Sequence, residues 1–215
     1  MLAGKNLMIY NLFNGKRDKM LTKANRNSAD KRGARELGNR AEVDFLLILY
    51  QKEFTILGID ENKDKFSGID FSAYRKPKCS NENYHLFDAA DFVTFQVKSQ
   101  ASCEDHLFAL QIKGWWKGNG IFDCKAKYIA FERVKDNCFI IVEVQKLLYF
   151  LDNILINKKT TKNLLEAKEN PHTVYLRMHH GRNNYIGYDE IIYLTRDDID
   201  KIGIARIWKK TDYLR

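Results

Sequence analysis

The strand on which the predicted fold is built is the stretch Phe92-Val93-Thr94-Phe95-Gln96-Val97-Lys98. It is rich in β-branched and aromatic residues, which favour a strand. Side chains two residues apart in a strand lie on the same face, so Gln96 and Lys98 share one face while Val97 turns toward the core. An amide oxygen and a cation are therefore expected side by side on the surface of a sheet.

The segments on either side of this strand are predicted to form further helices and strands. Apolar residues at helical spacing predict a helix from Arg35 to about Glu53. Strands are predicted at 54–58, 68–74, 127–134, 138–144, 173–178 and 190–194. Further helices are predicted at 144–156, before Pro171 and after Thr195, which is a favourable N-cap. This order indicates a mixed α/β or α+β domain.

The composition is that of a globular chain that folds without a membrane. Of its 215 residues 45% are hydrophobic and 30% are charged, and no apolar stretch approaches the roughly 20 residues that a membrane helix needs. The first ten residues lack the apolar core and the small-residue cleavage site of a secretory signal. We therefore expect an intracellular, cytoplasmic protein with no membrane contact.

Positive charge is concentrated at the two ends of the chain. The net charge is +8, yet residues 1–40 hold ten Lys and Arg against three Asp and Glu, and residues 204–215 hold four against one. The middle of the chain is slightly negative. Basic ends of this kind bind the phosphates of nucleic acids by releasing counterions; the alternative is that they are merely solvated.

Two carboxylates precede the central strand in an order that suggests metal chemistry. Glu42 lies on the first predicted helix, and Asp70 opens a strand in Gly68-Ile69-Asp70-Phe71. If this strand pairs with the central one, Asp70 joins Gln96 and Lys98. Carboxylate and amide oxygens suit Mg²⁺, and a lysine beside them can orient or activate water, which is the equipment for hydrolysing a phosphodiester.

This order resembles that of the PD-(D/E)xK nuclease superfamily, specifically the branch in which Gln replaces the middle acid, as in intron-encoded homing endonucleases. The resemblance covers about residues 35 to 145 and extends to restriction and resolvase-type enzymes. It implies a restriction-endonuclease-like mixed central sheet flanked by helices, and a cofactor of Mg²⁺, with Mn²⁺ as the alternative. By the same resemblance, Asp70, Gln96 and Glu42 would hold the metal and Lys98 would be the catalytic lysine. The chain departs from the pattern at Gln96, which is not acidic, and at Gly68-Ile69, where a proline often precedes the Asp.

These expectations combine into a metal-dependent DNA endonuclease that acts as a homodimer. The predicted parts are a basic N-terminal arm at 1–34, a nuclease core at 35–156 and a C-terminal extension packed on that core at 157–215. Contacts to DNA are expected from basic residues and from a Gly-rich aromatic loop, namely Arg26, Lys31, Arg32, Arg35, Arg40, Lys113, Trp115, Trp116, Lys117 and Arg182.

Several alternatives stay open at this point. A second Gln-x-Lys, Gln111-Ile112-Lys113, competes with the first and would use Asp88 or Asp91 as its acid. The chain is alternatively a noncatalytic nucleic-acid-binding protein on a degenerate nuclease fold, or an RNA-binding or interaction module without nuclease ancestry. The four cysteines include no Cys-x-x-Cys pair, so we expect reduced, mostly buried thiols rather than a zinc site.

Overall fold

The computed structural model describes residues 29–58, 68–75, 92–99, 106–114, 118, 120–180 and 186–210. Contacts divide the chain into two compact units, residues 1–39 and 40–215. The second unit holds every strand of the described residues, and it is the unit considered below unless the first is named.

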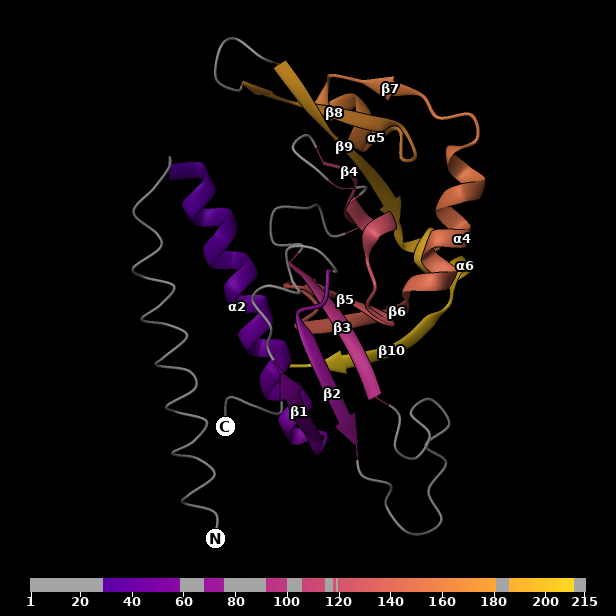
Figure 1. Cartoon of the computed structure of the whole chain (residues 1–215). Helices are drawn as coiled ribbons and strands as arrows, with labels where there is room; N and C mark the ends of the chain where they lie inside the picture. The colour runs from indigo at the N-terminus through magenta and orange to yellow at the C-terminus, as the bar shows by residue number, and fades with distance from the viewer. Residues whose placement is uncertain are drawn as a thin grey trace, which may run out of the picture. The chain divides into compact units, whose positions relative to one another are not determined.

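Six strands form the larger sheet, sheet A (Figure 1). In spatial order they are β1 (Phe54–Gly58), β2 (Phe71–Arg75), β3 (Phe92–Ser99), β5 (Tyr128–Arg133), β6 (Cys138–Glu143) and β10 (Ile204–Lys209). The β3–β5 pair is parallel, and every other neighbouring pair is antiparallel. Phe95 of β3 stands opposite Phe71 on one side and Tyr128 on the other. This register decides which side chains share a face.

A second sheet, sheet B, has four strands. In the sequence, its strands lie between strands of sheet A. Its order is β4 (Leu107–Lys113), β9 (Ile186–Thr195), β8 (Val174–His180) and β7 (Thr160–Thr161). The β7–β8 pair is parallel and the other pairs are antiparallel. β4 and the short 3₁₀ helix η1 (Gly120–Asp123) lie in the connection from β3 to β5.

Helix α2 (Ala29–Gln51) covers one face of sheet A from Arg40 onward (Figure 1). Its Phe45 is fully buried, with ring centroids 5.1 Å from Phe95, 5.1 Å from Phe139 and 5.6 Å from Trp208. Aromatic pairs at such separations add about 0.5–1.5 kcal/mol each beyond area burial. The cluster fixes α2 over β3, β6 and β10.

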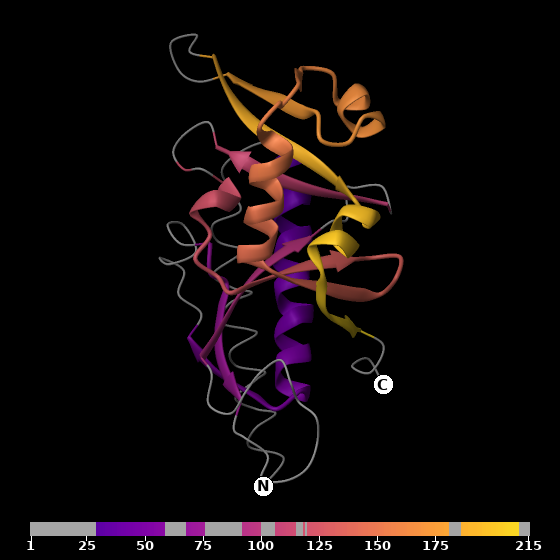
Figure 2. The same ribbon diagram turned by 90° about the vertical axis from the view of Figure 1, so that its right-hand side faces the viewer.

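The opposite face of sheet A packs against sheet B and two helices, α4 (Val144–Leu155) and α6 (Arg196–Ile202), which stand in front in Figure 2. Phe131 of β5 and Phe108 of β4 meet edge to face at 5.3 Å in this core. Helix α5 (Leu164–Glu169) lies in the connection from β7 to β8 and packs its buried Ala167 with Leu107 and Tyr193 of sheet B.

The structure confirms the mixed α/β class, with two mixed sheets flanked by helices. The strands predicted at 54–58, 92–98, 127–134 and 138–144 are present within a residue or two, and α2 begins at Ala29 rather than Arg35. Two differences matter: the described residues form two sheets instead of one, and neither β4 nor β10 was predicted as a strand. None of the helices in the described ranges is long and apolar enough to cross a membrane.

Candidate active site

Asp70 is fixed to the central strand by two hydrogen bonds. Its backbone N–H donates to the carbonyl of Phe95 at 2.9 Å, and its Oδ2 accepts from the backbone N–H of Val97 at 2.5 Å. Val97 is the residue between Gln96 and Lys98. The carboxylate therefore lies against the Gln-x-Lys segment, at the end of the antiparallel β2–β3 ladder.

Gln96 is buried on the face of sheet A opposite α2. It stands beside Ile129 in the parallel β3–β5 register and is only 8% exposed. Its Oε1 has no hydrogen-bond partner among the described residues. Leaving a buried acceptor unpaired costs about 1–3 kcal/mol, so this oxygen is suited to a ligand such as a cation or an ordered water.

The chain makes room for this amide with a glycine. Gly68 adopts φ +59°, and a Cβ atom there would lie 2.8 Å from Nε2 of Gln96 and 3.4 Å from Sγ of Cys124. The Cys124 thiol also donates to the Gly68 carbonyl at 3.5 Å. Gly68 keeps this space clear, because a side chain there would displace Gln96.

Lys98 shares the face of Gln96 and is exposed. Its charge and that of Asp70 both act on the buried Cys124. Burial raises the pKa of the Cys124 thiol, while Lys98 lowers and Asp70 raises it to smaller extents. The two charges consequently lie near one sulfur atom, and Asp70, Gln96 and Lys98 occupy one corner of sheet A. Cys124 itself was not predicted as part of the site.

Glu42 belongs to the helix layer on the other face of the sheet. It is partly buried and lies three residues before Phe45, on the side of α2 that packs against the strands. The Phe45 ring is 6.1 Å from that of Phe71, the residue after Asp70. The role of Glu42 as an accessory metal ligand stays a prediction.

The competing Gln111-Ile112-Lys113 segment lies in a different place. It belongs to β4 of sheet B, where Lys113 Nζ is 3.7 Å from a Glu190 carboxylate oxygen. Asp88 and Asp91, the acids it would need, lie outside the described residues. Of the acids predicted for the two segments, Asp70 is the one within the described residues, and it lies against Gln96 and Lys98.

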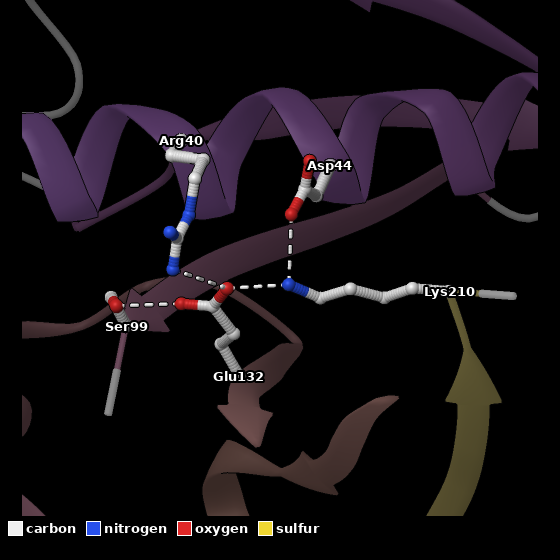
Figure 3. A network of polar contacts seen from close by, with 5 residues as sticks. All are labelled: Arg40, Asp44, Ser99, Glu132 and Lys210. Carbon is white, nitrogen blue, oxygen red and sulfur yellow. Dashed lines mark hydrogen bonds and ion pairs between the residues drawn. The ribbon is translucent and has the colours of Figure 1, made fainter. Parts of the chain in front are cut away.

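A buried polar network supports the end of β3 from the α2 side (Figure 3). Glu132 of β5 is fully buried and accepts from Ser99 Oγ at 2.6 Å and from Lys210 Nζ at 2.5 Å. Lys210 also donates to Asp44 at 2.8 Å, and Arg40 is 3.6 Å from Glu132. Two acids and two bases balance in charge. Because Ser99 directly follows Lys98, the network holds the backbone that carries the candidate lysine.

Sequence reasoning did not find Glu132, although a signal was present. A charged residue in the apolar run Tyr128-Ile129-Ala130-Phe131 needs a buried partner. The partner, Lys210, lies 78 residues away in the sequence, and no local pattern connects the two.

The structure describes only some of the residues that were predicted to contact DNA. Arg40 is half exposed while paired with Glu132, and Lys113 is exposed beside Glu190. Lys31, Arg32 and Arg35 lie in the first half of α2, within the N-terminal unit. Outside the described residues are Arg26, Trp115, Trp116, Lys117 and Arg182.

The donor atoms at this corner suit a hard cation. Over the described ranges, no three side chains of His, Cys, Asp and Glu are grouped as metal ligands. The donors are instead one carboxylate, on Asp70, and one unpaired amide oxygen, on Gln96. Mg²⁺ is commonly held by one or two carboxylates and keeps several waters, so this set fits Mg²⁺ without a cage of protein ligands.

Comparison of the chain with protein-family models, with curated proteins and with solved structures finds no match. Function is therefore inferred from the arrangement of these side chains.

Proposed function

We propose that the chain is a metal-dependent endonuclease that hydrolyses phosphodiester bonds in double-stranded DNA, on a variant PD-(D/E)xK site. The observation that carries the proposal is the bond from Val97 N–H to the Asp70 carboxylate. It joins an acid at the start of one strand to a Gln-x-Lys on the next, which is the juxtaposition that this chemistry requires.

Each residue has a distinct task. Asp70 and the unpaired oxygen of Gln96 would hold Mg²⁺, which when bound would supply polarisation of the scissile phosphate and neutralisation of developing charge. Glu42, on the α2 face of the sheet, is not part of this donor pair. Lys98, which is exposed on the same face as Gln96, would bind a phosphate oxygen or orient the attacking water. The backbone bond to Val97 keeps the Asp70 carboxylate from rotating away, which preorganises the site.

The order of elements supports the same proposal. A helix, three antiparallel strands, a crossover and a strand parallel to the third appear in that order as α2, β1, β2, β3 and β5. The sequence resemblance implied a mixed central sheet flanked by helices, and sheet A is a mixed sheet. The described residues of this crossover include β4 and η1.

DNA is the proposed substrate because of the charge at the ends. The ten Lys and Arg among residues 1–40 would supply phosphate contacts, while the core brings the acid and the lysine. Two copies of such a site, one for each strand of the duplex, would match the two-fold symmetry of a dimer, so the proposed active form is a homodimer.

The test is cleavage of plasmid DNA in Mg²⁺ by the purified chain and by Asp70→Ala and Lys98→Ala. We expect nicked and linear products from the wild type and a loss of at least about a hundredfold in both variants. Gln111→Ala is the matched control, because it removes the amide of the competing Gln-x-Lys at an exposed position, and it should cut like the wild type. Cleavage that survives Asp70→Ala and Lys98→Ala would refute the assignment.

The second candidate is a noncatalytic nucleic-acid-binding protein on the same fold, favoured by Gln96 standing where an acid is usual. It predicts DNA binding that does not depend on Mg²⁺ and no cleavage under any condition. A gel-shift assay run beside the plasmid assay separates the two candidates.

A further inference from the structure

Strands β8 and β9 continue as a two-stranded ribbon beyond the four-stranded part of sheet B. β7 pairs with β8 at Val174 and Tyr175, and β4 pairs with β9 from Glu190 onward. In the described part of the chain, residues 177–180 of β8 and 186–189 of β9 have only each other as strand neighbours. This ribbon is the end of β9 remote from α6 and lies at the top of Figures 1 and 2.

One face of the ribbon carries an arginine and a histidine that are held by a buried carboxylate. Asp189 stands opposite Arg177 in the register and is 5% exposed. Its Oδ2 accepts from Arg177 Nη2 at 2.5 Å and lies 2.7 Å from His179 Nε2. The Arg177 side chain is nevertheless 50% exposed, and that of His179 is 28% exposed. Both side chains are therefore fixed in orientation while part of each stays open to solvent.

Both acids of these two strands are covered by cations. Glu190, next to Asp189, is 2.8 Å from Lys158 Nζ and 3.7 Å from Lys113 Nζ, and its side chain is 16% exposed. The described residues of β8 and β9 include no further Asp or Glu. A polyanion can therefore approach the ribbon without facing an uncompensated carboxylate, which is the charge complementarity that a nucleic acid requires.

The pairing with Asp189 decides what Arg177 is suited to do. Because the carboxylate balances its charge, the guanidinium adds little to the general attraction for phosphates. It offers direction instead, since it is a planar fork with five N–H donors, and the bond to Asp189 occupies one of them. A fork held in one orientation matches the O6 and N7 acceptors that guanine presents in the major groove of DNA.

We propose that the ribbon enters the major groove of duplex DNA and that Arg177 reads a guanine there. This groove is about 12 Å wide and admits a two-stranded β-ribbon. His179 lies two residues along the same face, where it contacts the neighbouring part of the groove. The major groove of an RNA duplex is too narrow for such readout, so the partner is DNA. The inference takes DNA from the proposed function, but it requires no cleavage.

The test compares two pools of random-sequence DNA duplexes, one made with guanine and one with 7-deazaguanine. The analogue lacks the N7 acceptor but keeps the base pairing and the phosphates. Binding is measured without Mg²⁺, so that nothing is cut. We expect the wild-type chain to bind the 7-deazaguanine pool at least about fivefold more weakly, and duplex RNA should not compete. This comparison needs no variant, so it remains informative even if a variant misfolds.

Arg177→Gln then tests whether Arg177 is the residue that reads the guanine. Glutamine keeps an N–H donor for Asp189 but cannot donate twice to guanine, so this variant should bind both pools with equal affinity. Met178→Gln is the matched control, because Met178 is the next residue, is 49% exposed and lies on the opposite face of the ribbon. It should discriminate between the pools as the wild type does. The Tm of each variant reports whether its fold is intact.

The outcomes separate this inference from the proposed function. Equal affinity of the wild type for the two pools would overturn the groove contact even if the chain cuts DNA. Discrimination that survives in a folded Arg177→Gln, or that is lost in Met178→Gln as well, would also overturn it. Discrimination that depends on Arg177 alone would uphold the ribbon even if no cleavage occurs, and in that case the proposed function alone would fail.

Discussion

A Cβ atom on Gly68 would lie 2.8 Å from Nε2 of Gln96, so the amide occupies the space that any side chain at position 68 would need. The conformation at Gly68, with φ +59°, is also one that L residues adopt at a cost. The two residues are thereby coupled: the glycine two positions before Asp70 sets where the buried amide can stand.

The first prediction follows from this contact. Gly68→Ala should destabilise the fold by about 2–4 kcal/mol, from backbone strain and from the displaced amide together, and should reduce cleavage at least tenfold. Gly203→Ala is the matched control, since Gly203 has φ +94° but no atom within 4 Å of its Cβ position. It should lose only about 1–2 kcal/mol and keep its activity. Equal urea-unfolding losses for the two variants would show that the Gln96 contact is unimportant.

The second prediction concerns the charge of the donor set. Gln96→Glu places a second carboxylate beside Asp70, so it should destabilise the metal-free chain and strengthen Mg²⁺ binding by roughly tenfold, because charge count tunes affinity for hard cations. The measurement is the rise in Tm on adding Mg²⁺, which reports binding without requiring cleavage. Gln111→Glu, in the competing Gln-x-Lys, should leave the Mg²⁺-dependent shift unchanged. An equal shift in both variants would contradict a metal site at Gln96.

Local sequence pattern was sufficient where neighbours in sequence are neighbours in space. The neighbouring strands predicted at 127–134 and 138–144 pair as the β5–β6 hairpin, and Asn137 adopts φ +48° in the turn between them. The α6 start was predicted from Thr195, which forms a capping box with Asp198. Alternation in a strand was enough to place Gln96 and Lys98 on one face.

Pairing between distant segments could not be predicted in this way. β4 pairs with β9 so that Leu107 stands opposite Thr195, and β10 joins sheet A next to β6. Nothing in either segment's own pattern specifies its partner. The same reason hides Cys124 from the sequence, because its contact with Gly68 spans 56 residues and becomes visible only when η1 folds against the start of β2.

The third prediction concerns the buried network of Figure 3. Glu132→Ala leaves the Lys210 ammonium buried with Asp44 as its remaining acid, so the free energy of unfolding should fall by about 3 kcal/mol or more. Asp200→Ala breaks the exposed Arg196–Asp200 pair and should change it by less than about 0.5 kcal/mol. Urea denaturation of both variants checks the contrast, and a small loss in Glu132→Ala would mean that water replaces the carboxylate.

The fourth prediction is a pH dependence that originates at Asp198. Burial opposes the charge of this carboxylate, but hydrogen bonds from Thr195 and His172 outweigh burial and lower its pKa below the ordinary value of 3.8. A lowered folded-state pKa stabilises the fold above the unfolded value and loses that contribution as the pH falls through the folded value. Asp198→Asn should therefore flatten the decline in unfolding free energy below about pH 4.

The control for this prediction is Asp197→Asn, which removes the neighbouring exposed carboxylate of the same helical turn. At acid pH, the unfolding free energy of Asp197→Asn should fall more steeply with decreasing pH than that of Asp198→Asn. If both variants decline alike, the hydrogen bonds at Asp198 contribute nothing to acid stability.

The last prediction separates local charge from net charge in DNA binding. Replacing Lys31, Arg32 and Arg35 of α2 with Gln removes three of the ten basic residues among positions 1–40. If each contacts one phosphate, the slope of log K against log salt concentration should become shallower by about 0.9 per residue, and the affinity for DNA of any sequence should fall.

The control variant replaces Lys146, Lys159 and Lys201 with Gln, which lowers the net charge of +8 by the same three units at exposed positions elsewhere. That variant should keep the wild-type slope, because screened charges far from the phosphates release few counterions. Equal slopes for the two triple variants would mean that the positive excess acts as a diffuse field rather than as a docking arm.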